Sequence, residues 1–321
     1  MKAAVYYETG LPDVFRYEDR PDPDVSATSV LVQVEAVSIE GGDVLNRAGG
    51  DMPSKPHVVG YQCAGTIREA GSAVTDRKPG DRVVATMPFG SHAELVAVSS
   101  MQTWPLPEGM DVRLGACVPV AYGTAHECLF EFGRLKEGES VLIQAGAGGV
   151  GLAAVQLAKR AGATVLATAG SDEKLERLRE FGLDHGVNYR EGDWIAKAKG
   201  LSGGGVNLVV DSVGTTLLGS IQATGYRGRI VVVGNAGRAE ARGVDPALLS
   251  EQNRSLTGVF FGGSLIFERQ RSYPMVQSLI EDIAKGELKV VIDREFPLSE
   301  AAAAHAYIES RQAFGRVLLI P

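Results

Sequence analysis

One segment of this 321-residue chain restricts its fold more than any other. Residues 141–162 read VLIQAGAGGVGLAAVQLAKRAG, in which an apolar run leads into a cluster of glycines and then into an amphipathic stretch. The pattern predicts a buried strand at 141–145, a tight turn, and a helix at 149–161. Gly146, Gly148 and Gly151 give the turn the spacing G-x-G-x-x-G. A strand that runs through such a turn into a helix is typical of a parallel sheet.

The region that follows repeats this alternation. Apolar, Val-rich runs predict further strands at 164–169, 184–189, 206–213, 229–237 and 255–261, and helices are expected between them at 172–182, 193–200 and 215–224. Strands that are apolar on both faces need helices on both sides of the sheet. The expected fold class is therefore α/β, with a doubly wound parallel sheet.

The two ends of the chain have a different texture. Up to about residue 120, short β-prone runs such as VLVQVEAVSI and DRVVATM alternate with Gly and Pro turns. The C-terminal part adds helices in RQRSYPMVQSLIEDIAKG and EAAAAHAYIESR and a last strand in GRVLLIP. Two domains are the natural expectation for this length. We expect a β-rich domain at 1–122, a doubly wound domain at 123–258, and a return of residues 259–321 to the first domain.

Composition argues against several classes of protein. The net charge of −7 is spread along the chain without a basic block, so we expect no nucleic-acid partner and no binding to anionic membrane surfaces. No apolar run approaches the roughly 20 residues of a membrane span, and the N-terminus lacks the apolar core of a signal peptide. Three cysteines without a CxxC spacing predict free thiols in a reducing cytoplasm.

The position of the glycine cluster indicates a dinucleotide site. In such sites the first glycine permits a tight turn, the second lets a pyrophosphate approach the backbone, and the third lets the helix pack closely on the sheet. The helix N-terminus then offers N–H groups and the positive end of its dipole to the phosphates. The alternative is a glycine turn that serves packing alone.

The end of the second predicted strand favours NADPH over NADH. An NAD site has an acidic side chain there, which binds the ribose 2′-hydroxyl. This chain has Gly170, followed by Ser171 and Lys174. Glycine leaves room for a 2′-phosphate, the serine hydroxyl donates to it, and the lysine adds positive charge. Tyr189 and Arg190 follow the third strand and are candidates to flank the same phosphate. Because acidic residues adjoin Lys174, a purely solvated role is its alternative.

The chain as a whole resembles a known family, the zinc-independent quinone oxidoreductases of the medium-chain dehydrogenase/reductase superfamily. The likeness runs nearly end to end, through EAVSIEGGDVLNRAGG, HVVGYQCAGTI, KPGDRV, AYGTA, AGAGGVG, TAGSDEK, VNYRE, DSVG, VVVGNAG and GRVLLIP. The resemblance implies a GroES-like β-rich catalytic domain, a Rossmann domain, NADPH as hydride donor, an active site between the domains, and usually a homodimer.

The resemblance also implies roles for individual residues. The pyrophosphate would be lined by the turn that opens at Gly146, through Gly148, Gly149, Val150 and Gly151. The 2′-phosphate end would be held by Ser171, Lys174 and Tyr189, and the nicotinamide end by Thr124, Gly234, Asn235, Phe260 and Phe261. Arg316 resembles a basic residue that reaches the phosphates. The alternatives are a helix cap for Thr124, core packing for one of the two phenylalanines, and a surface charge for Arg316.

Zinc-dependent relatives carry metal ligands at positions that differ here. Catalytic zinc needs three N, S or O ligands and an open position. The matching positions hold Glu40, Tyr61 and Gln62, so one candidate ligand remains. Cys117 falls near the third ligand position without matching it, and the four-cysteine loop of the zinc enzymes is missing. We therefore expect no metal.

Without a metal, reduction must rely on positioning and hydrogen bonds. Tyr61 is the first candidate to supply the proton after hydride addition. Glu40, where the family commonly has Asn, is the second: it either faces the substrate, protonated by burial, or pairs with Arg47 in a structural role. We expect Asp43 to brace the local turn.

The sequence thus predicts a cytoplasmic, NADPH-dependent, zinc-independent enzyme that reduces quinones or related α,β-unsaturated carbonyls. Two alternatives remain open. One is an enoyl-type reductase of activated enones or acyl thioesters, for which no basic track is apparent in the sequence. The other is a cofactor-binding protein with little catalytic turnover.

Overall fold

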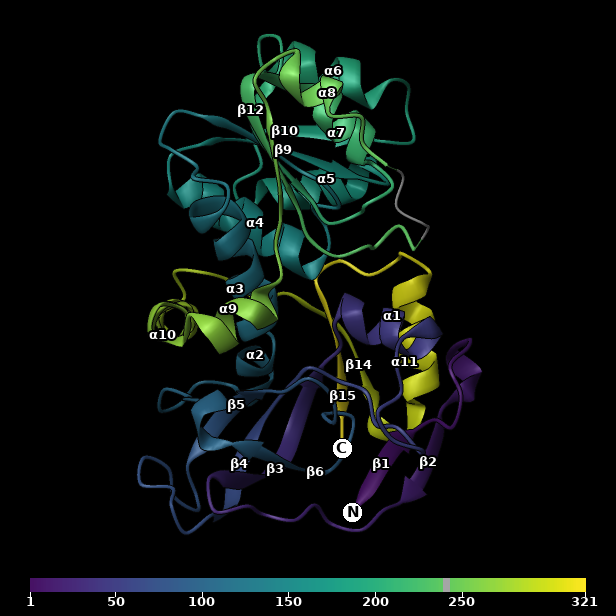
Figure 1. Ribbon diagram of the computed structural model, residues 1–321, viewed down its shortest axis with the longest axis vertical. Coiled ribbons are helices and arrows are strands. Elements are labelled where there is room, and N and C mark those ends of the chain that lie inside the picture. Colours follow the sequence, from purple (N-terminus) through teal and green to yellow (C-terminus); the bar gives the residue numbers. More distant parts are fainter. Residues whose placement is uncertain (239–242) are drawn as a thin grey trace. The chain divides into compact units, whose positions relative to one another are not determined.

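A computed structural model of the chain describes residues 1–238 and 243–321 and divides them into two compact units (Figure 1). Unit 1 comprises Met1–Val120 and Glu268–Pro321, and unit 2 comprises Ala121–Phe267. The sequence predicts these boundaries at 122/123 and 258/259. Unit 2 continues past the later boundary because the helix that follows its last strand packs within the same unit.

Unit 2 is built on six parallel strands in the order β10-β9-β8-β11-β12-β13. They are β8 (Ser140–Ile143), β9 (Thr164–Ala169), β10 (His185–Asn188), β11 (Val206–Asp211), β12 (Thr224–Val232) and β13 (Ser255–Gly258). Chain order therefore runs outward from β8 to one edge and then from β11 to the other. This is the doubly wound order 3-2-1-4-5-6, which confirms the expected α/β class. The winding reverses between β8 and β11.

Helices separate these strands as the alternating pattern predicts. They are α4 (Gly149–Arg160), α5 (Asp172–Arg179), α6 (Trp194–Leu201), α7 (Leu217–Ala223) and the short α8 (Ala247–Ser250), with α3 (Pro119–His126) before and α9 (Phe261–Phe267) after the sheet. A π-helical turn, Glu127–Glu131, continues α3. α4 is buried from Gly151 to Ala158, because the small residues of GLAAVQLA let it lie close to its neighbours.

Unit 1 contains an N-terminal sheet that the C-terminal strands complete. Its order is β14-β15-β3-β4-β5-β7, and β6 also pairs with β3. The strands are β3 (Ser29–Ser38), β4 (Gln62–Ala70), β5 (Arg82–Thr86), β6 (Leu95–Ser99), β7 (Thr103–Pro105), β14 (Ile292–Pro297) and β15 (Arg316–Ile320). A separate pair is formed by β1 (Lys2–Val5) and β2 (Arg16–Asp19). The helices are α1 (Gly41–Gly49), α2 (Val112–Ala116), α10 (Arg269–Ala284) and α11 (Ala301–Glu309).

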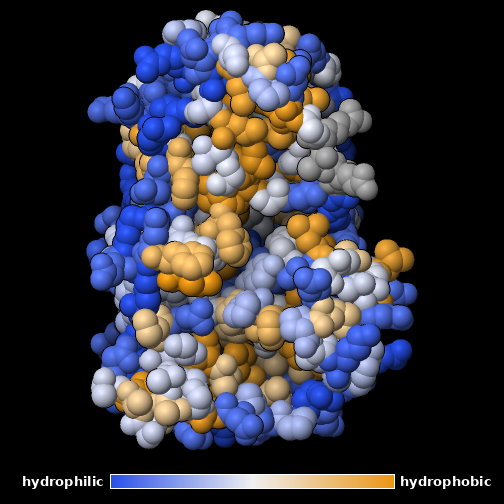
Figure 2. All heavy atoms as spheres, in the orientation of Figure 1, coloured by the Kyte–Doolittle hydropathy of each residue, from blue (hydrophilic) through white to orange (hydrophobic). Residues whose placement is uncertain are grey.

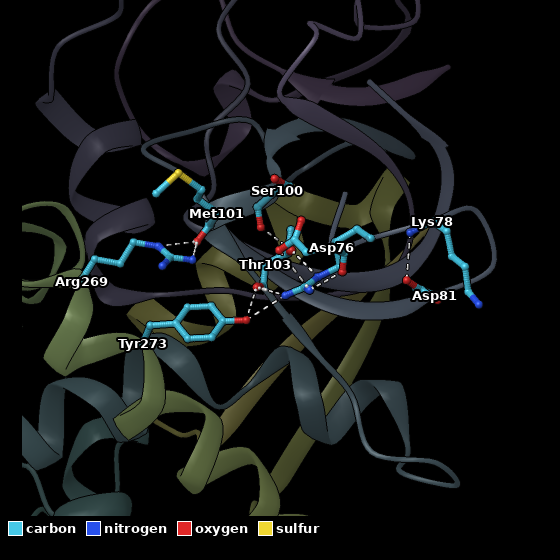
Figure 3. A network of polar contacts seen from close by, with 9 residues as sticks. Asp76, Lys78, Asp81, Ser100, Met101, Thr103, Arg269 and Tyr273 are labelled. Carbon is cyan, nitrogen blue, oxygen red and sulfur yellow. Dashed lines mark hydrogen bonds and ion pairs between the residues drawn. The ribbon is translucent and has the colours of Figure 1, made fainter. Parts of the chain in front are cut away.

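The C-terminal segment joins unit 1 through strand pairing and through side chains. β15 runs antiparallel to β3, with Leu318 opposite Ser38. Tyr273 of α10 stacks on Trp104 with ring centroids 5.2 Å apart. The Tyr273 hydroxyl accepts a hydrogen bond from Arg77 at 2.7 Å, and Arg269 donates to the Met101 carbonyl at 2.9 Å (Figure 3).

Polar residues cover much of the face drawn in Figure 2, but large apolar side chains are exposed around α9. Phe260, Ile266 and Phe267 have 77%, 63% and 85% of their surface exposed. Cys63, Cys117 and Cys128 are all buried free thiols. Within the described residues, every helix is too short or too polar to cross a lipid bilayer.

Candidate functional site

The glycine turn joins β8 to α4 in unit 2. Its left-handed residue is Ala145, with φ 52°, and not Gly146. Gly146 is needed for packing instead, because a Cβ there would lie 2.7 Å from Ala167 Cβ. Gly151 is also needed: its Cβ would lie 2.3 Å from the Ala145 carbonyl oxygen, so it faces the turn itself. Gly148 is exposed, and a Cβ there would meet nothing nearer than 3.4 Å. The outer side of the turn is therefore open.

This open side carries backbone N–H groups. Gly148 is the N-cap of α4, and the first bond inside the helix runs from Leu152 N to Gly148 O at 2.8 Å. The N–H groups of Gly149, Val150 and Gly151 precede that bond and have no acceptor within the helix. Gly149 and Val150 are partly exposed. Together with the helix dipole, these groups form a cradle that suits a phosphate.

The proposed 2′-phosphate residues gather at the carboxyl ends of β9 and β10. A Cβ on Gly170 would lie 2.8 Å from the Tyr189 hydroxyl and 3.4 Å from Arg190 Nε, so all three residues meet at one point. Ser171 caps α5 by accepting a hydrogen bond from the Lys174 backbone N–H at 3.4 Å. A side chain at position 170 would have to displace Tyr189. Position 170, where an NAD site has its carboxylate, therefore holds no side chain, and the nearby Asp172 carboxylate accepts a hydrogen bond from Asn188 Nδ2 at 3.2 Å.

The residues expected at the nicotinamide end lie in two places in unit 2. Gly234, with φ 71°, and Asn235 follow the end of β12. Asn235 touches the loop after β11, because a Cβ on Gly214 would lie 2.9 Å from Asn235 Oδ1. These two loops therefore lie together at the carboxyl edge of the sheet.

Thr124, Phe260 and Phe261 belong to the helical part of unit 2. Thr124 lies inside α3 and is 5% exposed, so it does not cap a helix. Phe261 is 5% exposed and packs on Gly123, where a Cβ would come within 2.4 Å of its ring. Phe260 is exposed. The alternative of core packing therefore holds for Phe261 alone.

A buried ion pair lies at the start of β15 in unit 1. Glu40 and Arg316 are 4% and 7% exposed, and Arg316 Nη2 donates to Glu40 Oε1. The same guanidinium donates to Ser38 Oγ at 2.6 Å and to the Ile39 carbonyl at 2.9 Å. Gln62 Nε2 donates to Glu40 Oε1 at 2.5 Å. Arg316 is therefore neither a surface charge nor free for a phosphate while these bonds hold.

The charges around this pair are arranged differently from our expectation. Arg47 does not pair with Glu40: it is buried, donates to the Gly10 carbonyl at 2.5 Å, and forms an ion pair with Glu309. Burial lowers the pKa of Arg316, but Glu40 together with Cys117 and Asp43 outweighs this, so that pKa lies above its ordinary value. Asp43 Oδ2 accepts a hydrogen bond from the Glu40 backbone N–H at 2.8 Å, which braces the first turn of α1 as predicted.

Tyr61 is held by α1. Its ring covers Gly42, where a Cβ would lie 2.2 Å from Tyr61 Cε2. Its hydroxyl oxygen accepts a hydrogen bond from Asn46 Nδ2 at 2.9 Å, which leaves its own proton available to another acceptor. Burial raises the pKa of Tyr61, and the bond from Asn46 offsets this only in part. The hydroxyl is therefore protonated at neutral pH.

Sequence reasoning missed Asn46. A usable signal was present, since Gly42 and Asn46 are four residues apart and share one face of a helix.

The residues at the positions of a catalytic zinc do not fit that metal. In the two stretches that the structure describes, no three His, Cys, Asp or Glu side chains are grouped as ligands. The Glu40 carboxylate is already bonded to a guanidinium, which repels a cation. Burial raises the pKa of Cys117 to about 11, so this thiol is not the thiolate that zinc binds.

Comparison with known proteins identifies similar chains. Residues 26–108 match the alcohol dehydrogenase GroES-like domain, and residues 149–282 match the zinc-binding dehydrogenase domain. Rattus norvegicus quinone oxidoreductase is 33% identical over 100% of this chain and 98% of its own length. The Rattus norvegicus synaptic vesicle membrane protein VAT-1 homolog is 34% identical over 96% of this chain and 81% of its own. Escherichia coli quinone oxidoreductase, solved in complex with NADPH, aligns with a TM-score of 0.95 and 30% identity over 100% of both chains.

Proposed function

We propose, from the premise that this chain belongs to the quinone oxidoreductase family of the medium-chain dehydrogenase/reductase superfamily, that it transfers hydride from NADPH to quinones or related α,β-unsaturated carbonyls. One observation carries the proposal: an open glycine turn lined with N–H groups follows β8, and the neighbouring strand β9 is followed by Gly170, where an NAD site would have a carboxylate side chain. The first feature suits a pyrophosphate, and the second suits a 2′-phosphate. The NADPH complex of the Escherichia coli relative supports this cofactor.

The proposal assigns the cofactor to unit 2, whose residues fit it. When bound, NADPH supplies a hydride equivalent to the acceptor. The backbone from Gly148 to Gly151 would hold the pyrophosphate, and Ser171, Lys174 and Tyr189 the 2′-phosphate. The loops at Gly234 and Asn235 lie on the opposite side of the winding reversal and would hold the nicotinamide half. Thr124 and Phe260 remain candidates for that end.

We assign the proton to Tyr61. Because its oxygen accepts a bond from Asn46, the Tyr61 O–H is left to donate toward the oxygen of the acceptor that is being reduced. A neutral donor aimed at developing negative charge stabilises the transition state and then delivers the proton. Glu40 has no comparable freedom, since Arg316 and Gln62 both bond its carboxylate. We therefore give Glu40 a structural role.

The proposed reaction needs no zinc. A quinone or an activated enone is already electrophilic, so hydrogen bonding and positioning take the place of a Lewis acid. Supporting this, the one carboxylate left at the ligand positions of the zinc relatives is neutralised by a guanidinium. We also propose a homodimer in a reducing cytoplasm, on the family resemblance and the three unpaired buried thiols. Light scattering of the purified protein tests the dimer.

The test is NADPH oxidation by the purified protein with three acceptors in parallel: 1,4-benzoquinone, an aliphatic enone and a crotonyl thioester. We expect turnover with the quinone, enhanced little or not at all by added zinc. Preference for the thioester would support an enoyl-type reductase instead. NADPH binding without turnover of any acceptor would support a cofactor-binding protein, and the absence of NADPH binding would refute the proposal.

A further inference from the structure

Four buried polar side chains line the carboxyl edge of the sheet in unit 2. Gln144 follows β8, Thr168 lies in β9, Asp211 ends β11, and Ser220 lies in α7. All four are at most 2% exposed. We call them the carboxyl-edge relay.

The relay is a continuous chain of hydrogen bonds. Thr168 Oγ1 donates to Gln144 Oε1 at 2.7 Å, and Gln144 Nε2 donates to Ser220 Oγ at 3.2 Å. Ser220 Oγ donates in turn to Asp211 Oδ2 at 2.7 Å. Each hydroxyl has one proton, and each uses it toward the same end of the chain. The bonds therefore all point from β9 toward β11, and none competes with another.

One end of the relay holds the glycine turn. Thr168 Oγ1 accepts a hydrogen bond from the Ala145 N–H at 3.1 Å, and the Thr168 carbonyl accepts one from the Gly146 N–H at 2.8 Å. Ala145 is the residue that adopts the left-handed conformation, which is unfavourable for alanine unless neighbouring contacts impose it. The bond from its N–H is one such contact.

The other end holds the loop that follows β11. Asp211 Oδ1 accepts from the N–H groups of Val213 and Gly214 at 2.9 and 3.0 Å, and both carboxylate oxygens lie 2.9 Å from Thr216 Oγ1. This loop is bonded to the loop after β12, since Ala236 N donates to Ser212 O at 2.9 Å. The loop after β12 contains the residues assigned above to the nicotinamide half.

The relay therefore crosses the point at which the winding reverses. A dinucleotide bound to a sheet of this order spans that point, with its 2′-phosphate end toward β9 and its other half toward β11 and β12. The relay is buried in unit 2 at this reversal, and its two ends hold the backbone on each side of it. Because its members are buried, they act on a ligand only through the loops that they hold.

We propose that the carboxyl-edge relay fixes the position of the glycine turn relative to the loops after β11 and β12. Gln144, Thr168, Ser220 and Asp211 are therefore positioning residues for the intact dinucleotide. This inference rests on the proposed function, because it takes NADPH as the ligand. A role in stability alone would not distinguish one ligand from another. A positioning role predicts the largest loss of affinity for a ligand that contacts both sides of the winding reversal.

The test compares two ligands on Ser220→Ala. NADPH spans the reversal, whereas adenosine 2′,5′-bisphosphate reaches only its β9 side. Loss of one hydrogen bond of the relay is expected to weaken NADPH about fivefold, while the bisphosphate stays within about twofold of wild type. The matched control is Thr224→Val, which removes a hydroxyl that is 1% exposed and donates to the Ile221 carbonyl at 2.6 Å, at the amino end of β12. This variant should lose thermal stability and bind both ligands as wild type does.

A double variant tests whether the four residues act as one unit. Thr168→Val and Ser220→Ala break the same chain, so together they should weaken NADPH by clearly less than the product of the two single effects. Additive effects, equal weakening of both ligands by Ser220→Ala, or unchanged NADPH binding in that variant would each overturn the inference. If Ser220→Ala does not fold, Ser220→Cys keeps the volume with a weaker donor, and the same difference between ligands is expected. Failure of wild type to bind NADPH would instead refute the proposed function itself.

Discussion

Replacing Arg316 by methionine probes the least expected feature of the protein. The side chain keeps much of its volume, but Glu40, which is 4% exposed in the wild type, loses its positive neighbour. Removing one partner of a buried ion pair typically destabilises a protein by about 3–5 kcal/mol, because the other charge stays desolvated. We expect a loss in this range at neutral pH. Ser38 and the Ile39 carbonyl also lose a donor, which adds to the effect.

The loss should depend on pH with a defined sign. Burial raises the pKa of Glu40, and Arg316 and the hydrogen bond from Gln62 oppose that rise, so Arg316→Met removes the larger of the two opposing influences and raises this pKa further. A carboxyl whose folded-state pKa lies above its unfolded value, about 4.3, contributes most stability below that value and loses it as pH rises through the folded-state pKa. The difference between wild type and variant should thus grow from acid toward neutral pH, by at most about 1.4 kcal/mol per pH unit.

Urea unfolding of both proteins at several pH values measures this difference. Two comparisons control it. Arg113→Met removes an arginine that is 47% exposed and also pairs with two carboxylates, and it should cost less than about 1 kcal/mol. The double variant Glu40→Gln/Arg316→Met should recover much of the stability, because residue 40 then carries no charge that is left without its partner. A loss below about 1 kcal/mol that does not change with pH would refute our account of the pair.

Three further predictions concern binding and turnover. Tyr61→Phe should lower quinone turnover about 100-fold and leave the Kd for NADPH unchanged, and Asn46→Ala should lower turnover about fivefold. A wild-type rate in Tyr61→Phe would show that Tyr61 is not the proton donor. Lys174→Ala should weaken NADPH about tenfold in fluorescence titration but leave NADH nearly unaffected, and an equal effect on both would mean that the 2′-phosphate site is misplaced. Gly148→Ala should keep the Tm of the wild type and weaken the binding of NADPH, whereas Gly151→Ala should lower the free energy of unfolding by about 1–3 kcal/mol. The reverse pattern would contradict the packing described for the turn.

Most elements of the parallel sheet in unit 2 were predictable because each depends on a short stretch of chain, whereas α3, α8 and α9 were not predicted. The β8–turn–α4 unit follows from apolar periodicity and glycine spacing, and the same periodicity placed the later strands and helices. Several elements of unit 1 escaped this reasoning, β14 and α1 among them. β14, with sequence IDREFP, is largely polar and becomes a strand only because β15 offers it a partner. α1 begins with two glycines, and its cap lies in residues 40–43, where sequence reasoning looked for catalysis.

Within the candidate site, residue types were easier to predict than partners. The open backbone at Gly148 and the missing carboxylate at Gly170 follow from the motif itself. That Gly146 is needed for packing depends on the close approach of Ala167 in β9, and the left-handed conformation of Ala145 has no signal in the motif. In the same way, no local pattern distinguishes the buried Phe261 from the exposed Phe260.

The sequence by itself determined that a strand, a glycine turn and a helix N-terminus meet in unit 2, since these depend on backbone freedom and dipoles within about twenty consecutive residues. Only the tertiary structure decided that Glu40 pairs with Arg316, 276 residues away, and not with Arg47 on its own helix. The reason is physical: a buried charge pairs with whichever opposite charge the packing of strands brings within reach, and β15 is placed beside β3 by the whole of unit 1.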